Sequence, residues 1–175
     1  RLPVGNQNEK ELDENGKPLG GDQKTYHEDG SLRSEVLYID GLRRGLMIFY
    51  YPNGNVQFEI PYKNGIIDGV AKRYNKAGKI RQESTFEEGL LNGPDKTYNG
   101  LDVLMYECDY MHGVKDGPIK SYSNEGILIM EGMFVKGLPN GLWRFYDKHG
   151  KLKDEKYYDK GLARKMQVFD LREPK

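Results

Sequence analysis

Short runs of apolar residues bounded by glycine, asparagine or aspartate recur along the whole chain. In the copy that spans residues 46–69, one run ends at Tyr50, a second extends from Val56 to Tyr62, and Pro52-Asn53-Gly54 lies between them. Runs of about five to seven residues bounded in this way are typical of β-strands joined by tight turns. Glycine is too frequent, and apolar residues at helical spacing too few, for helices of three turns. The pattern therefore predicts consecutive β-hairpins.

The hairpin pattern returns every 24 residues through six copies. The repeated tyrosines are Tyr26, Tyr50, Tyr74, Tyr98, Tyr122 and Tyr146. The repeated glutamates are Glu35, Glu59, Glu83, Glu107, Glu131 and Glu155, and two series of glycines begin at Gly21 and Gly41. A fixed period of this length indicates an array of one supersecondary unit in which each copy contacts mainly its neighbours. We expect an all-β fold: one elongated, twisted antiparallel sheet, a β-meander solenoid of six 24-residue hairpins.

The ends of the chain differ from this array. Residues 1–20 keep the period poorly and are expected to form an N-terminal cap or degenerate half-repeat, whereas residues 21–165 hold the repeats. Met166–Asp170 resembles one more first strand, so residues 166–175 are expected to be a capping strand and tail. The sequence begins at Arg1, which leaves two locations open: cytoplasmic, or exported to a bacterial envelope after removal of a signal peptide.

The turn within each hairpin decides which side chains share a face. A two-residue loop at Asp29-Gly30 would pair Tyr26 with Arg33, whereas a three-residue loop closed by a bulge would pair Tyr26 with Leu32. We expect the bulged turn because it separates apolar from polar side chains better. One face would then carry the six repeated tyrosines together with a second aromatic series, packed as core. That second series is Tyr38, Tyr62, Phe86, Tyr110, Phe134 and Tyr158.

Composition narrows the classes of function. Only 37% of the residues are hydrophobic and 31% are charged, which suits a thin structure with aromatic-rich faces. Lys+Arg and Asp+Glu both number 27 and are interspersed. Binding to nucleic acid or to an anionic membrane normally needs a basic excess or stripe. Nucleic-acid binding is therefore not expected, and membrane or lipid binding is not favoured.

Residues that could carry chemistry are sparse. His27, His112 and His149 occupy three different positions of the repeat, so they do not form a close pair at metal-ligand spacing. Cys108 lacks a neighbouring base, which favours buried packing over a reactive thiol. The glutamates recur in all six copies, and active sites ordinarily break such symmetry; accepting turn N–H groups or pairing with nearby cations are the alternatives. No catalytic residue, cofactor or metal is expected.

Seven apolar residues break the polar pattern expected on the opposite face of the later copies. They are Met105, Ile119, Ile129, Met133, Trp143, Phe145 and Tyr157. Clustered exposed aromatic and methionine side chains are typical of protein-binding surfaces. The alternative is that the sheet curls and buries them against its own C-terminal segment. We hypothesise that this face binds a protein partner. Open sheet edges at both ends could also mediate end-to-end self-association.

The order Tyr122-Ser-Asn-Glu-Gly126-Ile-Leu128-Ile-Met-Glu131, followed by Lys136-Gly137-Leu-Pro-Asn-Gly141, resembles the MORN repeat, in the bacterial variant found in YwqK-like antitoxin proteins. The resemblance covers about residues 16 to 165. It implies consecutive hairpins in one sheet, a role in protein interaction or scaffolding, and no shared catalytic motif. We therefore expect a non-enzymatic scaffold that binds protein, in antitoxin-like fashion where the subfamily is right. The alternative is an exported envelope or membrane-associated scaffold that binds lipid or a surface protein.

Overall fold

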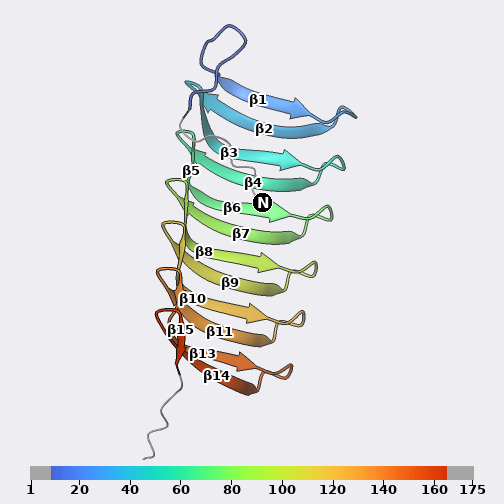
Figure 1. Cartoon of the computed structure of the whole chain (residues 1–175). Coiled ribbons are helices and arrows are strands. Elements are labelled where there is room, and N and C mark those ends of the chain that lie inside the picture. Colours follow the sequence, from blue (N-terminus) through green and yellow to red (C-terminus); the bar gives the residue numbers. More distant parts are fainter. Residues whose placement is uncertain (1–8, 165–175) are drawn as a thin grey trace, which may run out of the picture.

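The computed structural model describes residues 9–164, which form one open antiparallel sheet without helices (Figure 1). The strands are β1 (Gly21–Tyr26), β2 (Leu32–Ile39), β3 (Leu42–Tyr50), β4 (Val56–Lys63), β5 (Ile66–Ile67), β6 (Gly69–Tyr74), β7 (Ile80–Glu87), β8 (Leu90–Tyr98), β9 (Leu104–Met111), β10 (Val114–Tyr122), β11 (Leu128–Val135), β12 (Leu138–Pro139), β13 (Gly141–Tyr146), β14 (Leu152–Asp159) and β15 (Leu162–Arg164). Strands follow one another in chain order, with β5 and β12 pairing beside this path. The predicted elongated meander of hairpin repeats is confirmed.

Each hairpin contains the predicted bulged turn and, in addition, a second irregularity that the sequence analysis missed. Tyr26 pairs with Leu32 as expected, but Thr25 pairs with Ser34, so Arg33 has no partner across the hairpin. The same position is skipped in every repeat. The skipped residues are Arg33, Gln57, Arg81, Met105, Ile129 and Lys153.

This extra residue reverses the faces of the sheet within each hairpin. Because side chains alternate along a strand, one inserted residue moves all later side chains to the other face. Glu35 accepts a hydrogen bond from the Tyr50 hydroxyl, so the repeated tyrosines and glutamates share a face. Tyr38 lies three residues after Glu35 and points to the other face. The expectation that both aromatic series share one face is therefore wrong. We call the face of the Tyr38 series the inner face and that of the Tyr26 series the outer face.

The sheet bends where successive hairpins meet, at Gly45 and the equivalent glycines of the later repeats. Between the pairs Cys108–Ile119 and Tyr110–Lys115, three residues of β10 lie opposite one residue of β9. Gly117, in the middle of the three, has φ 134°, and a β-carbon there would lie only 2.7 Å from the Asp109 Cβ. Only glycine suits both the dihedral angle and the close approach. The bend divides each hairpin into a part beside the turn and a part beside the loop, and the inner faces of these two parts turn toward one another.

Side chains from both sides of the bend pack together on the inner face and form two apolar clusters. The first contains Met47, Phe49, Phe58, Ile60, Tyr62, Ile67 and Phe86. The second contains Tyr106, Cys108, Tyr110, Ile119, Met130, Phe134, Trp143, Phe145 and Tyr158. Between them lies a polar group in which buried Asp95 accepts hydrogen bonds from Ser84 and Gln82. The core is thus a single layer of side chains on one side of the sheet.

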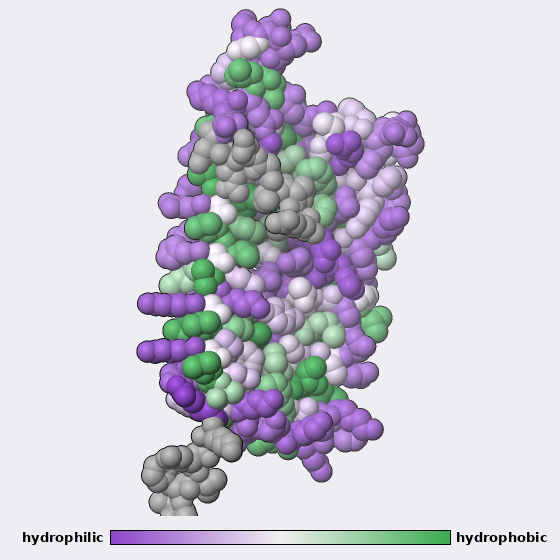
Figure 2. All heavy atoms as spheres, in the orientation of Figure 1, coloured by the Kyte–Doolittle hydropathy of each residue, from purple (hydrophilic) through white to green (hydrophobic). Residues whose placement is uncertain are grey.

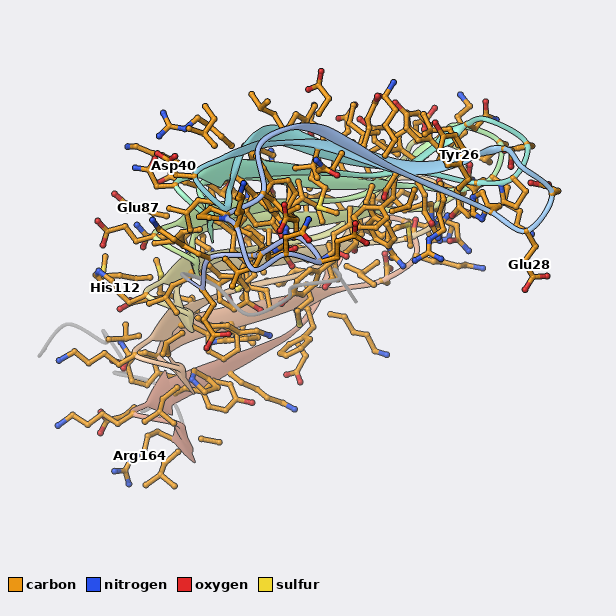
Figure 3. All side chains as sticks on the ribbon, turned by 90° about the horizontal axis from the view of Figure 1, so that it is seen from above. Tyr26, Glu28, Asp40, Glu87, His112 and Arg164 are labelled. Atoms are coloured by element: carbon orange, nitrogen blue, oxygen red, sulfur yellow. The ribbon has the colours of Figure 1, made fainter. Side chains whose placement is uncertain are left out.

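The sheet has two lateral edges of different kinds (Figure 3). Tyr26 and Glu28 mark the loop edge, where the two strands of each hairpin connect. Asp40 and His112 mark the turn edge, where two-residue turns join successive hairpins, and both have positive φ, 51° and 48°. Successive labelled turns are displaced around the long axis in this view, which is the twist expected of a long β-array.

The described part of the N-terminal region lies across the first of these turns. Leu12 forms an isolated bridge with Pro18, and the N–H of Glu11 donates to the carbonyl of Gly41. The Glu11 carboxylate forms an ion pair with Arg43, whose guanidinium stacks 5.3 Å from the centre of the Tyr62 ring. These contacts hold residues 9–20 against repeat one. The predicted strand Met166–Asp170 lies outside the described residues.

Candidate functional site

The outer face carries a ladder of hydrogen bonds between neighbouring repeats. Each tyrosine from the second repeat onward donates its hydroxyl to the glutamate 15 residues before it. The donor–acceptor pairs are Tyr50–Glu35 (2.6 Å), Tyr74–Glu59 (2.9 Å), Tyr98–Glu83 (2.7 Å), Tyr122–Glu107 (2.9 Å) and Tyr146–Glu131 (2.5 Å). Each of these five glutamates thus accepts a hydrogen bond from the tyrosine of the next repeat. From the sequence, these tyrosines were expected on the face of the second aromatic series.

Cations flank this ladder. Lys24 lies 3.3 Å from Glu35, and Lys72 lies 3.8 Å from Glu83. Arg144 contacts glutamates on both neighbouring strands, Glu131 at 3.5 Å and Glu155 at 3.1 Å. These side chains are partly exposed, so each pair contributes little to stability. The outer ladder is thus a surface of alternating charges whose side chains bond to neighbouring strands.

The ladder predicts an alkaline titration. Burial, followed by the hydrogen bond to glutamate, raises the pKa of Tyr50, Tyr74, Tyr98 and Tyr122 to about 12. An unfolded tyrosine titrates at about 10, so the folded state binds more protons between these values and stability falls as pH rises through them. We expect the urea unfolding midpoint to drop between about pH 10 and 12, with the contribution complete below about pH 10. Tyrosinate absorbance of folded and urea-unfolded protein superimposing over this range would contradict the ladder.

Two of the seven candidate binding residues are core residues. Trp143 is 7% exposed and Ile119 is 4% exposed, and both lie in the second inner cluster. The indole ring contacts Phe134 and Tyr158 edge-on, with ring centres 5.3 and 5.7 Å apart. Its Nε1 is buried and has no hydrogen-bond partner among the described residues. Neighbouring strands of the array thus bury these two side chains on the inner face.

The other five candidates are spread over three places. Phe145 lies on the inner face, partly buried, with the Lys156 ammonium 5.4 Å from its ring centre. Met105 and Ile129 are the skipped residues near the loop edge. Met133 and Tyr157 are exposed on the outer face. The seven residues therefore do not form one surface, although two of them belong to an exposed group described next.

Exposed apolar side chains gather on the outer face beside the turn edge of the later repeats. We call this group the C-terminal outer patch: Leu90, Met111, Val114, Met133, Val135, Leu138, Tyr157 and Leu162. The pairs Met111–Val114 and Val135–Leu138 face one another across successive turns. The patch is continuous from turn to turn, since a β-carbon at Gly137 would lie 3.1 Å from Val114 Cγ1. Figure 2 shows hydrophobic side chains alternating with protruding hydrophilic ones along this edge.

The surroundings of the patch are basic at its last two turn tips and hollowed on one side. Lys136 and Lys160 occupy the turn positions with positive φ between its apolar members. A shallow depression of about 190 Å³ lies next to Met133 and includes Pro118 and Leu142 in its lining. The sequence contains a partial signal for this surface: apolar residues stand immediately before and after the turns at 112–113 and 136–137, as they also do at the first turn, 40–41.

Other potential chemistry is accounted for by packing and turns. Burial raises the pKa of the Cys108 thiol, which keeps it protonated. His27 Nε2 contacts the carbonyl oxygen of Tyr50 at 2.9 Å across the loop edge. Within residues 9–164 no three histidine, cysteine or carboxylate side chains converge as metal ligands. The same stretch contains no helix long and apolar enough to cross a bilayer.

The chain is built from MORN repeats. The model of the MORN repeat variant matches residues 19–40, 43–64, 67–88 and 139–160, about half of the sequence, and the chain belongs to this family. MORN repeats are generally associated with binding of proteins or membrane lipids. A comparison with curated proteins finds no match.

The two repeats that this family model leaves out keep the same hairpin geometry. Strands β8 to β11 pair with the bulge and bend of the other repeats. They differ in side chains. Asp102, with φ 62°, stands in place of the loop glycine, and Met105 and Ile129 stand where the matched repeats have polar residues. These departures from the repeat lie in the half of the chain that carries the C-terminal outer patch.

Proposed function

We propose that this protein is a non-enzymatic scaffold that binds a protein partner through the C-terminal outer patch. The observation that carries the proposal is the gathering of eight exposed apolar side chains on one face of a single-layer sheet. Contiguous patches of this kind, rimmed by polar residues, are typical of interaction sites. Methionine and tyrosine, two of its residue types, are enriched at protein interfaces.

The other broad surfaces fit this role less well. The inner face is filled by its own aromatic side chains, and the outer ladder pairs its charges within the sheet. The patch, in contrast, exposes Leu138 by 48% and Leu162 by 61%, and both lie at the projecting turn edge. A partner could cover the turn edge without any rearrangement of the repeats. An antitoxin-like role is the special case in which that partner is a toxin; rescue of growth on co-expression with a candidate toxin tests it.

A charge within the patch is expected to abolish partner capture. Leu138→Asp would place a carboxylate among Val114, Val135 and Leu162, which a bound partner would have to desolvate. Central interface substitutions cost about 2 kcal/mol or more, so we expect recovery of a specific partner to fall at least about tenfold in quantitative affinity capture. The matched control is Leu46→Asp, which changes an equally exposed outer-face leucine near the other end of the array. Equal loss in both variants, with unchanged circular dichroism, would contradict the assignment to the patch.

Binding to an anionic lipid surface is the second candidate, and Lys136 and Lys160 at the turn tips favour it. Basic side chains beside exposed apolar ones can combine charge attraction with insertion. In this case the wild-type protein should float with vesicles that contain anionic lipid, and the double variant Lys136→Glu, Lys160→Glu should not. A protein that stays at the bottom of the gradient with both neutral and anionic vesicles excludes this candidate and leaves the protein-binding proposal standing.

A further inference from the structure

We propose that β1 recruits an extended, acidic segment of a partner protein as an additional strand of the sheet. The proposal is independent of the C-terminal outer patch, since it concerns the opposite end of the array. The observation behind it is that the tyrosine of β1 lacks the hydrogen bond to a glutamate that the other repeated tyrosines make. Six repeated tyrosines are present, and five of them donate to a glutamate on the strand before.

Tyr26 is the tyrosine left over. Its side chain is 59% exposed, and its hydroxyl makes no hydrogen bond with a described residue. Lys24 beside it contacts Glu35 on β2. The cations at the same position of later repeats each also have a glutamate opposite on the preceding strand, in the pairs Lys72–Glu59, Lys96–Glu83, Lys120–Glu107 and Arg144–Glu131. Two donors on the outer face of β1 thus lack the carboxylate that every later repeat receives from the preceding strand.

The N-terminal region explains why this carboxylate is missing. Glu11 precedes Glu35 by one period and would be the ladder partner of Tyr26 in a regular array. Instead it crosses the first turn to the inner face, where it accepts from Tyr38 at 2.7 Å and pairs with Arg43. Among residues 9–164, β1 pairs with β2 only. A strand edge with unpaired N–H and C=O groups is a template for β-augmentation.

The neighbouring side chains define the segment that fits. Pairing as in the rest of the array would put a glutamate opposite Lys24, within reach of the Tyr26 hydroxyl. On the other face it would meet Gln23 and Thr25, so small or polar residues suit the positions next to the glutamate. β1 is six residues long, which limits the added strand to about that length.

A second copy of this chain is a poor occupant of the same edge. The glutamate it could offer is Glu155 on β14. Residues 162–164 and residues 18–20 hold the same position within the repeat, so β15 of the first copy would occupy the place that Pro18–Gly20 of the second copy needs. The unmatched donors therefore point to a free extended segment rather than to head-to-tail stacking.

The test uses a strand of the protein itself as probe. In the array, Glu83 of β7 faces Lys96 and accepts from Tyr98, the equivalents of Lys24 and Tyr26. A fluorescent peptide with the sequence of Ile80–Glu87 should bind the full chain, as measured by anisotropy. Replacement of its glutamate by glutamine should weaken binding at least about fivefold, because a charge-assisted pair is lost. Tyr26→Phe and Lys24→Gln should each weaken binding of the original peptide severalfold.

Tyr122→Phe is the matched control, because it removes the same hydroxyl from inside the array and should leave peptide affinity unchanged. Leu138→Asp should also leave it unchanged, which separates this site from the outer patch. Absence of peptide binding, binding that ignores the peptide glutamate, or equal weakening by Tyr26→Phe and Tyr122→Phe would each overturn the proposal.

Discussion

Trp143→Ala is expected to destabilise the protein by about 3–5 kcal/mol, the range for loss of a buried large aromatic side chain. The indole fills the space over Gly132, where a β-carbon would lie 2.3 Å from Trp143 Cδ2, and it contacts Phe134 and Tyr158 edge-on. Residues 9–164 form one sheet without a second layer that could close the cavity. Single domains are stable by about 5–15 kcal/mol, so a large part of this margin would disappear. Urea unfolding followed by circular dichroism measures the loss.

Tyr157→Ala provides the comparison for this prediction. Tyr157 lies on β14, next to the strand of Trp143, but it faces outward and is 45% exposed. Removing it should change stability by about 1 kcal/mol or less, as expected for partly exposed positions. Similar losses in both variants would show that the inner and outer faces are assigned the wrong way round. An early, separate transition in Trp143→Ala would indicate that the last repeats unfold first, as repeat arrays permit.

Local sequence signals were enough to predict the hairpins and their order. Glycine at a fixed interval forces turns at fixed places, and short runs between turns can only pair with their neighbours in sequence. The pairing of Tyr26 with Leu32 also followed from turn chemistry. These features depend on the backbone of a few adjacent residues, which is the information that a single sequence holds most directly.

The assignment of faces failed because it depends on one residue per hairpin. The skipped position holds Arg33, Gln57 and Met105 in different repeats, so its side chain carries no consistent signal. The extra residue of a bulge is left unpaired in the ladder, so its side chain need not be of one type. Once the skipped residue is included in the register, the constant separation of 15 residues between each glutamate and the following repeated tyrosine predicts the hydrogen-bonded ladder.

The candidate binding surface was only partly predictable for the same reason. Met133 and Tyr157 were identified because they interrupt a polar pattern, but Trp143 and Ile119 interrupt it equally and are buried. Sequence shows that a residue departs from the repeat. Which face such a residue occupies depends on how many residues the two bulges and the bend insert into the alternation of side chains. That number is a property of the folded sheet.

Gly117→Ala is expected to be the most damaging backbone substitution at the bend. Its φ of 134° is strained for any L-residue, at a cost of about 1–3 kcal/mol. The added methyl group would also lie 2.7 Å from Asp109 Cβ on the facing strand, so β9 and β10 would have to separate. We expect a fall in the urea midpoint larger than strain alone produces, together with exposure of the adjacent core residues Cys108 and Ile119. Reaction of the single cysteine with a thiol reagent under native conditions would report that opening.

Gly45→Ala isolates the contribution of the close approach. Gly45 holds the same position in the first bend, with φ 75°, but a β-carbon there meets no atom within 4 Å. Its cost should therefore be that of a left-handed alanine, about 1 kcal/mol. The difference between the two variants measures how tightly β9 and β10 approach one another at the bend. If Gly45→Ala proved as costly as Gly117→Ala, and Cys108 stayed protected in both, the bend would owe its shape to the dihedral angle and not to packing.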